Sequence, residues 1–441
     1  MRRLVPMFSA CTLSLLSSWA SGAGLLDAYQ SAREQNATFR AARHEREAGH
    51  QSLAIARADL LPNLSANAAR ANNKGDRTLS GLAATPLDYR SAQDSLVLRQ
   101  PLFNYEAYIR YQQGGVQVAY SDAVFDRKES ELALDVSAAY FDVLLATEKV
   151  ALADAEVLAF GDQYRLAQRR KSGGEGTVTE IAESESRLRV AEAGRVDAMN
   201  QLSVAKRVLE GITGKPAGDL RLLRKDYTPV GMQPQNLDEW LNIASEKNPE
   251  ILAQRKVLES ASLDVDRNRA GHLPRLDLVA SVSNTENDTV NTLNQKIHTR
   301  SLGLQLNVPL FAGWKVSAQT DQAIANRERS SAELDAVVSK VLVEVTRQFL
   351  ATQTGIGKVA AYAKAVEAGH VAVEGTKKGM AAGIRTNTDV LDAERLLFSA
   401  RRDLAQSRYD FLASKLKLKA AAGILSGQDV ADIDMLLVEK E

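Results

Sequence analysis

Two carboxylates stand three residues apart in the stretch 383–392, with an arginine four residues before the first. Thr386, followed three residues later by Asp389, is a relative of the capping box, so a helix is predicted to begin here after a break at Gly383. Residues i and i+3 share one helix face, so Asp389 and Asp392 are expected to point the same way. A symmetric ring of such pairs around a pore would form a cation-selective constriction, and multivalent cations would block it.

Composition excludes several classes of protein. The 441 residues include 55 basic and 55 acidic side chains, and a balanced charge argues against a nucleic-acid partner. The histidine-containing stretch 44–47 lacks the second histidine of a zinc motif, and 211–215 lacks the first glycine of a phosphate loop. We therefore predict no enzyme activity, no cofactor and no metal site.

The first 23 residues have the pattern of a signal peptide. Arg2 and Arg3 precede an apolar run that leads to the small residues 21–23. Cys11 is the only cysteine and lies in this segment, so the mature chain is expected to have no disulfide. No later stretch reaches the roughly 18 uncharged apolar residues of a membrane helix, so any entry into a membrane must use strands.

The chain contains a duplicated unit of about 200 residues. Leu-Pro at 61–62 recurs at 273–274, and Pro-Leu-Phe at 101–103 recurs at 309–311. The threonine and acid of the opening stretch have counterparts at Thr177 and Glu180. Both halves therefore carry the same elements in the same order.

Each half is predicted to begin with an amphipathic helix, over 25–60 and 237–272, followed by a β-hairpin. In 301–310 leucine and valine alternate with polar residues, which is typical of a membrane strand with one apolar face. No proline occurs between Pro101 and Pro216 or after Pro309, so long helices are expected next. Apolar residues at steps of seven predict coiled packing of the returning helix; they are Val390, Leu397, Leu404, Phe411 and Leu418, and Ile181, Leu188, Leu202 and Leu209 with Arg195 interrupting.

The predicted division of the chain has five segments. They are a signal peptide over 1–23, a first repeat over 24–216, a linker over 217–236, a second repeat over 237–422 and a tail over 423–441. The first repeat is predicted to contain a β-hairpin over 62–103, a helical hairpin over 104–211 and a tip over 172–180. The second repeat is predicted to contain a β-hairpin over 274–311, a helical hairpin over 312–422 and a tip over 379–392.

Two hairpins supply four strands per chain, whereas a closed membrane barrel needs at least about eight. Open strand edges in lipid leave backbone groups without hydrogen bonds. One chain cannot close a barrel alone, but three could supply twelve strands.

This pattern resembles the TolC family of outer-membrane channel-tunnels over nearly the whole mature chain. The duplication, the Leu-Pro before each hairpin, the Pro-Leu-Phe before each long helix and the sequence of 383–393 carry the resemblance. It implies a mainly α homotrimer whose shared 12-stranded transmembrane β-barrel is continuous with a periplasmic α-helical barrel. It further implies a passive duct in the outer membrane, spanning into the periplasm, that is opened by an inner-membrane transporter and a periplasmic adaptor.

The same resemblance implies roles for six residues. Asp389 and Asp392 match the acidic ring of the channel entrance. Arg385, Glu180 and Gln163 match a latch that holds the entrance closed. Met380 stands where the family usually has a tyrosine of that latch, which puts one hydrogen bond of the closed state in doubt.

Several alternatives remain open from the sequence. The chain most resembles the branch for type I secretion, in which an ABC transporter exports a protein such as a protease or lipase. A multidrug efflux pump with an RND transporter is the alternative, and a structural periplasmic coiled-coil adaptor without a barrel is a second. The acids could also be ordinary first-turn residues that favour the helix dipole, and Arg385 and Glu180 ordinary surface charges.

The tryptophans of the mature chain are expected to be packing residues. These are Trp240 and Trp314. Near the strand–helix junctions, Phe103, Phe311 and Trp314 could instead anchor the protein at a membrane interface.

Overall fold

The computed structural model describes residues 23–78, 80–224, 226–289 and 292–439, and the side chains outside 287–294. The predicted signal peptide lies outside the described residues except for Ala23. The described chain forms two compact units, one of Arg43–Phe125 with Pro249–Val338 and the other of Asp126–Asn248 with Ser339–Glu441 and the described part of Met1–Ala42. Among the described helices, none has an 18-residue window apolar enough to cross a lipid bilayer.

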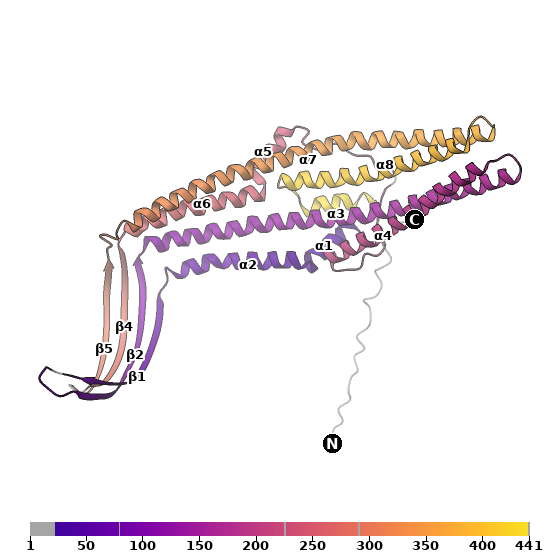
Figure 1. Ribbon diagram of the computed structural model, residues 1–441. Helices are drawn as coiled ribbons and strands as arrows, with labels where there is room; N and C mark the ends of the chain where they lie inside the picture. Colours follow the sequence, from indigo (N-terminus) through magenta and orange to yellow (C-terminus); the bar gives the residue numbers. More distant parts are fainter. Residues whose placement is uncertain (1–22, 79, 225, 290–291, 440–441) are drawn as a thin grey trace, which may run out of the picture. The chain divides into compact units, whose positions relative to one another are not determined.

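The first of these units contains a four-stranded antiparallel sheet. Its strands are β1 (Asn63–Arg77), β2 (Thr85–Phe103), β4 (Arg275–Thr289) and β5 (Thr292–Asn307). They lie side by side in the order β1-β2-β4-β5, so the two hairpins join through β2 and β4 (Figure 1).

The register gives this sheet two different faces. Leu98 of β2 lies opposite Ala280 of β4, which lies opposite Leu302 of β5. Leu302 is 75% exposed, although it belongs to a row of apolar side chains. The other face is polar, with Ser281 bonded to Ser301 at 2.7 Å between the hydroxyl oxygens. The alternation predicted for the membrane strands is confirmed.

The single helices predicted over 25–60 and 237–272 are wrong, because each is broken in two. The first forms α1 (Leu25–Gln35) and α2 (Ala37–Ala58), and the second forms α5 (Leu237–Lys247) and α6 (Pro249–Arg269), followed by a 3-10 turn at Ala270–His272.

An asparagine causes each break. Asn36 has an extended backbone, and its Oδ1 accepts a hydrogen bond from the Phe39 amide at 3.0 Å, which caps α2. Its Nδ2 donates to the Ile212 carbonyl at 3.2 Å. Asn248 donates equivalently to the Ala421 carbonyl at 2.8 Å. The breaks therefore tie α1 and α5 to the C-terminal ends of the two returning helices.

The long helices run without a proline, as the sequence predicts. They are α3 (Tyr105–Ser172), α4 (Val178–Thr213), α7 (Lys315–Ala381) and α8 (Asn387–Ala421). The turns between them contain Gly174 and Gly383, whose positive φ angles of 82° and 75° favour glycine.

Helix α8 carries the main apolar contacts of the second unit. Of its predicted heptad residues, Val390, Leu397, Phe411 and Leu418 are buried. Gly355 and Gly369 allow α7 to pack closely against α8. A β-carbon at Gly355 would lie 3.1 Å from Phe411, and one at Gly369 would lie 3.2 Å from Leu397. The prediction that this heptad series is core is confirmed at these four positions, whereas Leu404 is only half-buried.

Polar and aromatic contacts join α8 to α3. Phe160 packs edge-on against Phe398 with 6.5 Å between ring centroids. Tyr409 donates to the Glu148 carboxylate at 2.6 Å, and burial raises the pKa of Glu148. A hydrogen bond inside this layer is therefore shielded from water.

The linker and the tail pair with each other. Strand β3 (Leu222–Leu223) lies antiparallel to β6 (Leu437–Val438), and α9 (Gly427–Asp434) packs on α1. The Asp434 carboxylate accepts from the Leu25 amide at 2.6 Å, at the start of α1. Trp240 is fully buried and its indole donates to the Pro234 carbonyl at 2.8 Å, which confirms it as a packing residue.

Candidate functional site

The two helix starts at the tip are built alike. Thr177 and Thr386 are the N-caps of α4 and α8, and each hydroxyl accepts from the amide three residues later. Glu180 and Asp389 return the bond, since each carboxylate accepts from the amide of its threonine, at 3.3 and 2.8 Å. Both halves thus contain a full capping box, and the helix start predicted at Thr386 is confirmed.

Asp389 uses its carboxylate locally. One oxygen accepts from both the amide and the hydroxyl of Thr386, and these bonds lower the pKa of Asp389. The other oxygen lies 4.0 Å from Nη1 of Arg385. Asp389 therefore stays ionised at neutral pH, and its side chain remains partly exposed.

Asp392 reaches across to the neighbouring helix. Its Oδ1 lies 3.0 Å from Nη2 of Arg187 in α4 and 3.8 Å from Nε of Arg395 in α8. The side chain is half exposed, so the pair is worth at most about 1 kcal/mol. Asp389 bonds to its own helix start, whereas Asp392 joins α8 to α4.

The four latch residues are not bonded to one another within the described part of one chain. Arg385 contacts Asp389, and the Glu180 carboxylate caps α4. Gln163 is buried in α3, and its Oε1 has no hydrogen-bond partner among the described residues. Met380 is half-buried at the end of α7. The latch therefore stays a prediction.

Polar contacts that the sequence did not reveal hold α8 against α4. Asn387 donates from Nδ2 to the Ser184 hydroxyl at 2.8 Å, and both side chains are buried. One residue along, the Thr388 hydroxyl donates to Glu183 at 2.8 Å on the exposed side. Below them Leu391 packs with apolar residues of α3 and α4. The sequence contains one signal for these contacts between α8 and α4, namely that the two helix starts occupy equivalent positions in the duplicated halves.

A buried carboxylate lies deeper in the same region. Glu394 of α8 is 3% exposed and pairs with Lys377 of α7 at 2.8 Å. Its second oxygen has no partner among the residues described. Charged groups therefore connect α8 with both α4 and α7 just behind the tip.

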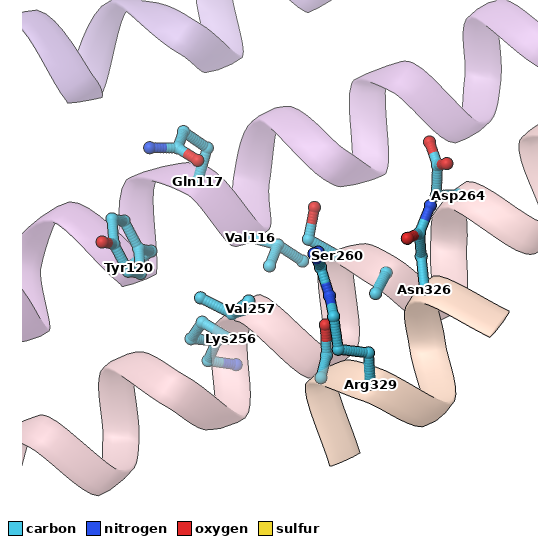
Figure 2. A pocket seen from close by; sticks show the side chains of 11 residues that line it. Val116, Gln117, Tyr120, Lys256, Val257, Ser260, Asp264, Asn326 and Arg329 are labelled. Atoms are coloured by element: carbon cyan, nitrogen blue, oxygen red, sulfur yellow. The ribbon is translucent and has the colours of Figure 1, made fainter. Parts of the chain in front are cut away.

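The other unit contains a shallow groove of about 340 Å³ between α3, α6 and α7. Figure 2 shows Tyr120, Lys256, Asp264 and Arg329 around it. Lys256 is already paired with Glu259 at 2.7 Å. No group of three or more metal-binding side chains occurs in the described ranges.

Comparison with known families identifies the chain. A family model described as "Outer membrane efflux protein" matches residues 28–215 and 240–424. The chain belongs to the outer membrane efflux protein family. Its resemblance to TolC is thereby confirmed, and it is a protein of the outer membrane. The family and its solved structures are channels rather than enzymes.

Members of the outer membrane efflux protein family align with nearly all of this chain. The alkaline protease secretion protein AprF of Pseudomonas aeruginosa is 36% identical, over 99% of this chain and 91% of its own length. The proteases secretion protein PrtF of Dickeya chrysanthemi is 37% identical, over 98% and 95%. The outer membrane protein TolC of Vibrio cholerae is 28% identical, over 98% of both chains.

Solved structures of this family share the fold. CusC, described by its transmembrane channel formation, superposes with a TM-score of 0.79 at 16% identity, over 93% of this chain and 95% of that one. VceC of Vibrio cholerae gives 0.78 at 16% identity, over 90% and 96%. The predicted fold class, mainly helical with a small β portion, is confirmed.

The Asn387–Ser184 bond is expected to hold the start of α8. Asn387→Ala removes the buried donor, so amide hydrogen exchange in the first two turns of α4 and α8 should rise about five-fold, the effect of a bond worth about 1 kcal/mol. Thr388→Ala, which loses an exposed bond on the same turn, is the control and should change exchange less than about two-fold. Equal effects of the two substitutions would contradict the role of the buried bond.

Proposed function

We propose that this chain is the outer-membrane channel of a type I secretion system that exports a protein, of the kind represented by secreted proteases. The full-length similarity to two protease secretion proteins, AprF and PrtF, carries this proposal. Similarity to TolC of Vibrio cholerae is lower over the same length. An inner-membrane ABC transporter and a periplasmic adaptor are the expected partners.

The working form in this proposal is a homotrimer. The outer edges of β1 and β5 have no strand partner in the described sheet. Edges in lipid need partners, because the bilayer core offers no water to their backbone groups. Pairing β5 of one copy with β1 of the next, three times, gives a closed barrel of twelve strands.

The helical unit offers a second surface for the same assembly. Apolar side chains remain exposed along α7, at Val343, Leu350 and Val371, and along α4, at Val190 and Val204. In α7, Val343 and Leu350 are one heptad apart, and Leu350 and Val371 are three heptads apart. This spacing places them on one side of the helix and suits packing against another helix. We propose that these stripes pack between neighbouring copies.

The tip is the proposed entrance of this duct. Three copies would bring three Asp389 and three Asp392 around one axis, and both side chains are partly exposed. The proposed latch would then form between Arg385 and the side of the neighbouring tip that carries Glu180. Since one chain leaves Arg385 exposed, a partner copy can reach it.

Deletion of the gene in its own host tests the proposed function. At least one protein without a cleaved signal peptide should vanish from the medium and accumulate in the cells. Susceptibility to antibiotics should change less than about two-fold, and the full-length chain on a plasmid should restore secretion. An unchanged set of secreted proteins, with susceptibility raised four-fold or more, would support drug efflux instead.

The acidic entrance is tested by the double substitution Asp389→Asn with Asp392→Asn. Asparagine keeps a side-chain oxygen for the α8 cap but removes both charges. Block of the trimer by cobalt hexammine in planar bilayers should weaken at least about ten-fold. Glu175→Gln, which removes an exposed tip charge outside the proposed ring, is the control. Block that persists in the double variant would rule out the ring.

A further inference from the structure

An arginine interrupts the apolar face of the sheet. The row Leu98–Ala280–Leu302 crosses three strands on this face. Two residues further along the strands, away from the helices, Arg300 lies opposite Val282 on the same face. The alternation of apolar and polar residues predicts an apolar residue at this position. Arg300 is exposed.

The hollow beside Arg300 is apolar and open. It has a volume of about 390 Å³, and its lining is mostly aliphatic and includes two serines and Arg300; the lining residues are Leu64, Leu96, Leu98, Ala280, Ser281, Val282, Arg300, Ser301 and Leu302. Leu64, Leu96 and Leu302 are between 45% and 75% exposed in the single chain, and Leu98 is half-buried. An acyl chain could lie along this hollow with a charged group at its end.

Arg300 has no acidic partner among the described side chains, because its neighbours on this face are already paired. Asp94 accepts two bonds from Arg70, both at 2.8 Å. Glu286 pairs with Lys296, and Asn284 bonds His298. Arg300 is therefore the first charge beyond the apolar rows, and no described side chain of the chain neutralises it.

The opposite end of the apolar face carries aromatic side chains. Phe311 and Trp314 are 76% and 75% exposed and pack edge to face, 6.1 Å between centroids. The prediction that Trp314 is a packing residue is wrong. Its φ of 65° is rare for a bulky residue, and Leu310 close by in the sequence is 92% exposed. Exposed aromatic pairs of this kind suit the membrane–water interface.

The spacing places Arg300 at the other interface. Arg300 lies seven residues before the end of β5 at Asn307, about 23 Å of strand and about 18 Å along the membrane normal at a tilt of about 40°. The residues from Val308 to Leu310 continue beyond the end of the strand, so the distance from Arg300 to the aromatic end is comparable with the apolar band of about 25 Å in outer-membrane barrels. Since the helices follow the aromatic end, Arg300 belongs to the outer leaflet, whose lipid is the phosphorylated glycolipid lipid A.

We propose that Arg300 and the adjoining hollow bind lipid A, with a phosphate on the guanidinium and an acyl chain against the leucines. A guanidinium without a protein partner offers the paired donors that suit phosphate oxygens. The proposal rests on the proposed insertion of the sheet into the outer membrane. Three copies of the chain would provide three such sites.

Native mass spectrometry of the detergent-solubilised trimer with bisphosphorylated lipid A tests this site. Arg300→Gln should weaken binding at least about ten-fold, and Arg300→Lys should weaken it less. Arg99→Gln is the matched control, since Arg99 lies on the polar face beside Asp277 at 3.8 Å and should not affect binding. The wild-type trimer should bind dephosphorylated lipid A as weakly as Arg300→Gln binds the phosphorylated form.

Two outcomes would overturn the proposal. One is equal binding of lipid A by the wild type and Arg300→Gln; the other is binding of phosphatidylglycerol as tight as that of lipid A, which would assign the site to phospholipid in general. Heat-modifiable trimers of each variant in the outer-membrane fraction show that insertion is intact. Loss of insertion in the wild type would instead count against the proposed function.

Discussion

The unpaired edges of the sheet are the constraint on which the rest of the account depends. β1 and β5 are separated by two strands within the described chain, so neither can satisfy the backbone groups of the other. The same sheet exposes a face of leucines that is unfavourable in water. In a lipid bilayer the leucine side chains are favourably placed, but the backbone N–H and C=O groups of the open edges would lack hydrogen bonds. A partner strand along each edge would supply those hydrogen bonds. The location in the outer membrane and the proposed self-association are therefore both explained by this sheet.

Because the chain is duplicated, its two halves contain equivalent caps and helix breaks. Positions at which the halves differ form contacts that one half alone could not make. Thr177 and Thr386 cap their helices in the same way, and Asn36 and Asn248 make equivalent breaks. Yet Asp392 of the second half pairs with Arg187 of the first. The tip is thus held by contacts between unlike halves.

Much of the fold could be predicted from the sequence, because periodicity and caps are local. The capping box at Thr386 and the alternation in 301–310 both appear as expected. The breaks at Asn36 and Asn248 were missed although both carry local signals: Asn36 caps α2 through the Phe39 amide, and Pro249 follows Asn248 at the first position of α6. Their bonds to the distant Ile212 and Ala421 carbonyls could not be predicted from the sequence. The Asp392 partner was missed for a similar reason, since it depends on how α8 rotates against α4. Trp314 is exposed, so its expected packing role is wrong, whereas the alternative of an interfacial residue agrees with its exposure.

Disulfide trapping between β1 and β5 tests the central claim most directly. The two strands lie about 14 Å apart within one chain, beyond the roughly 7 Å that a disulfide spans, so any bond must join different copies. A cysteine at Leu64, combined in turn with one at Leu302, Leu304 or Leu306, should give a covalent trimer at one register in oxidised outer membranes, and each single cysteine should not. Monomers at every register, with the chain present in the membrane, would contradict the account.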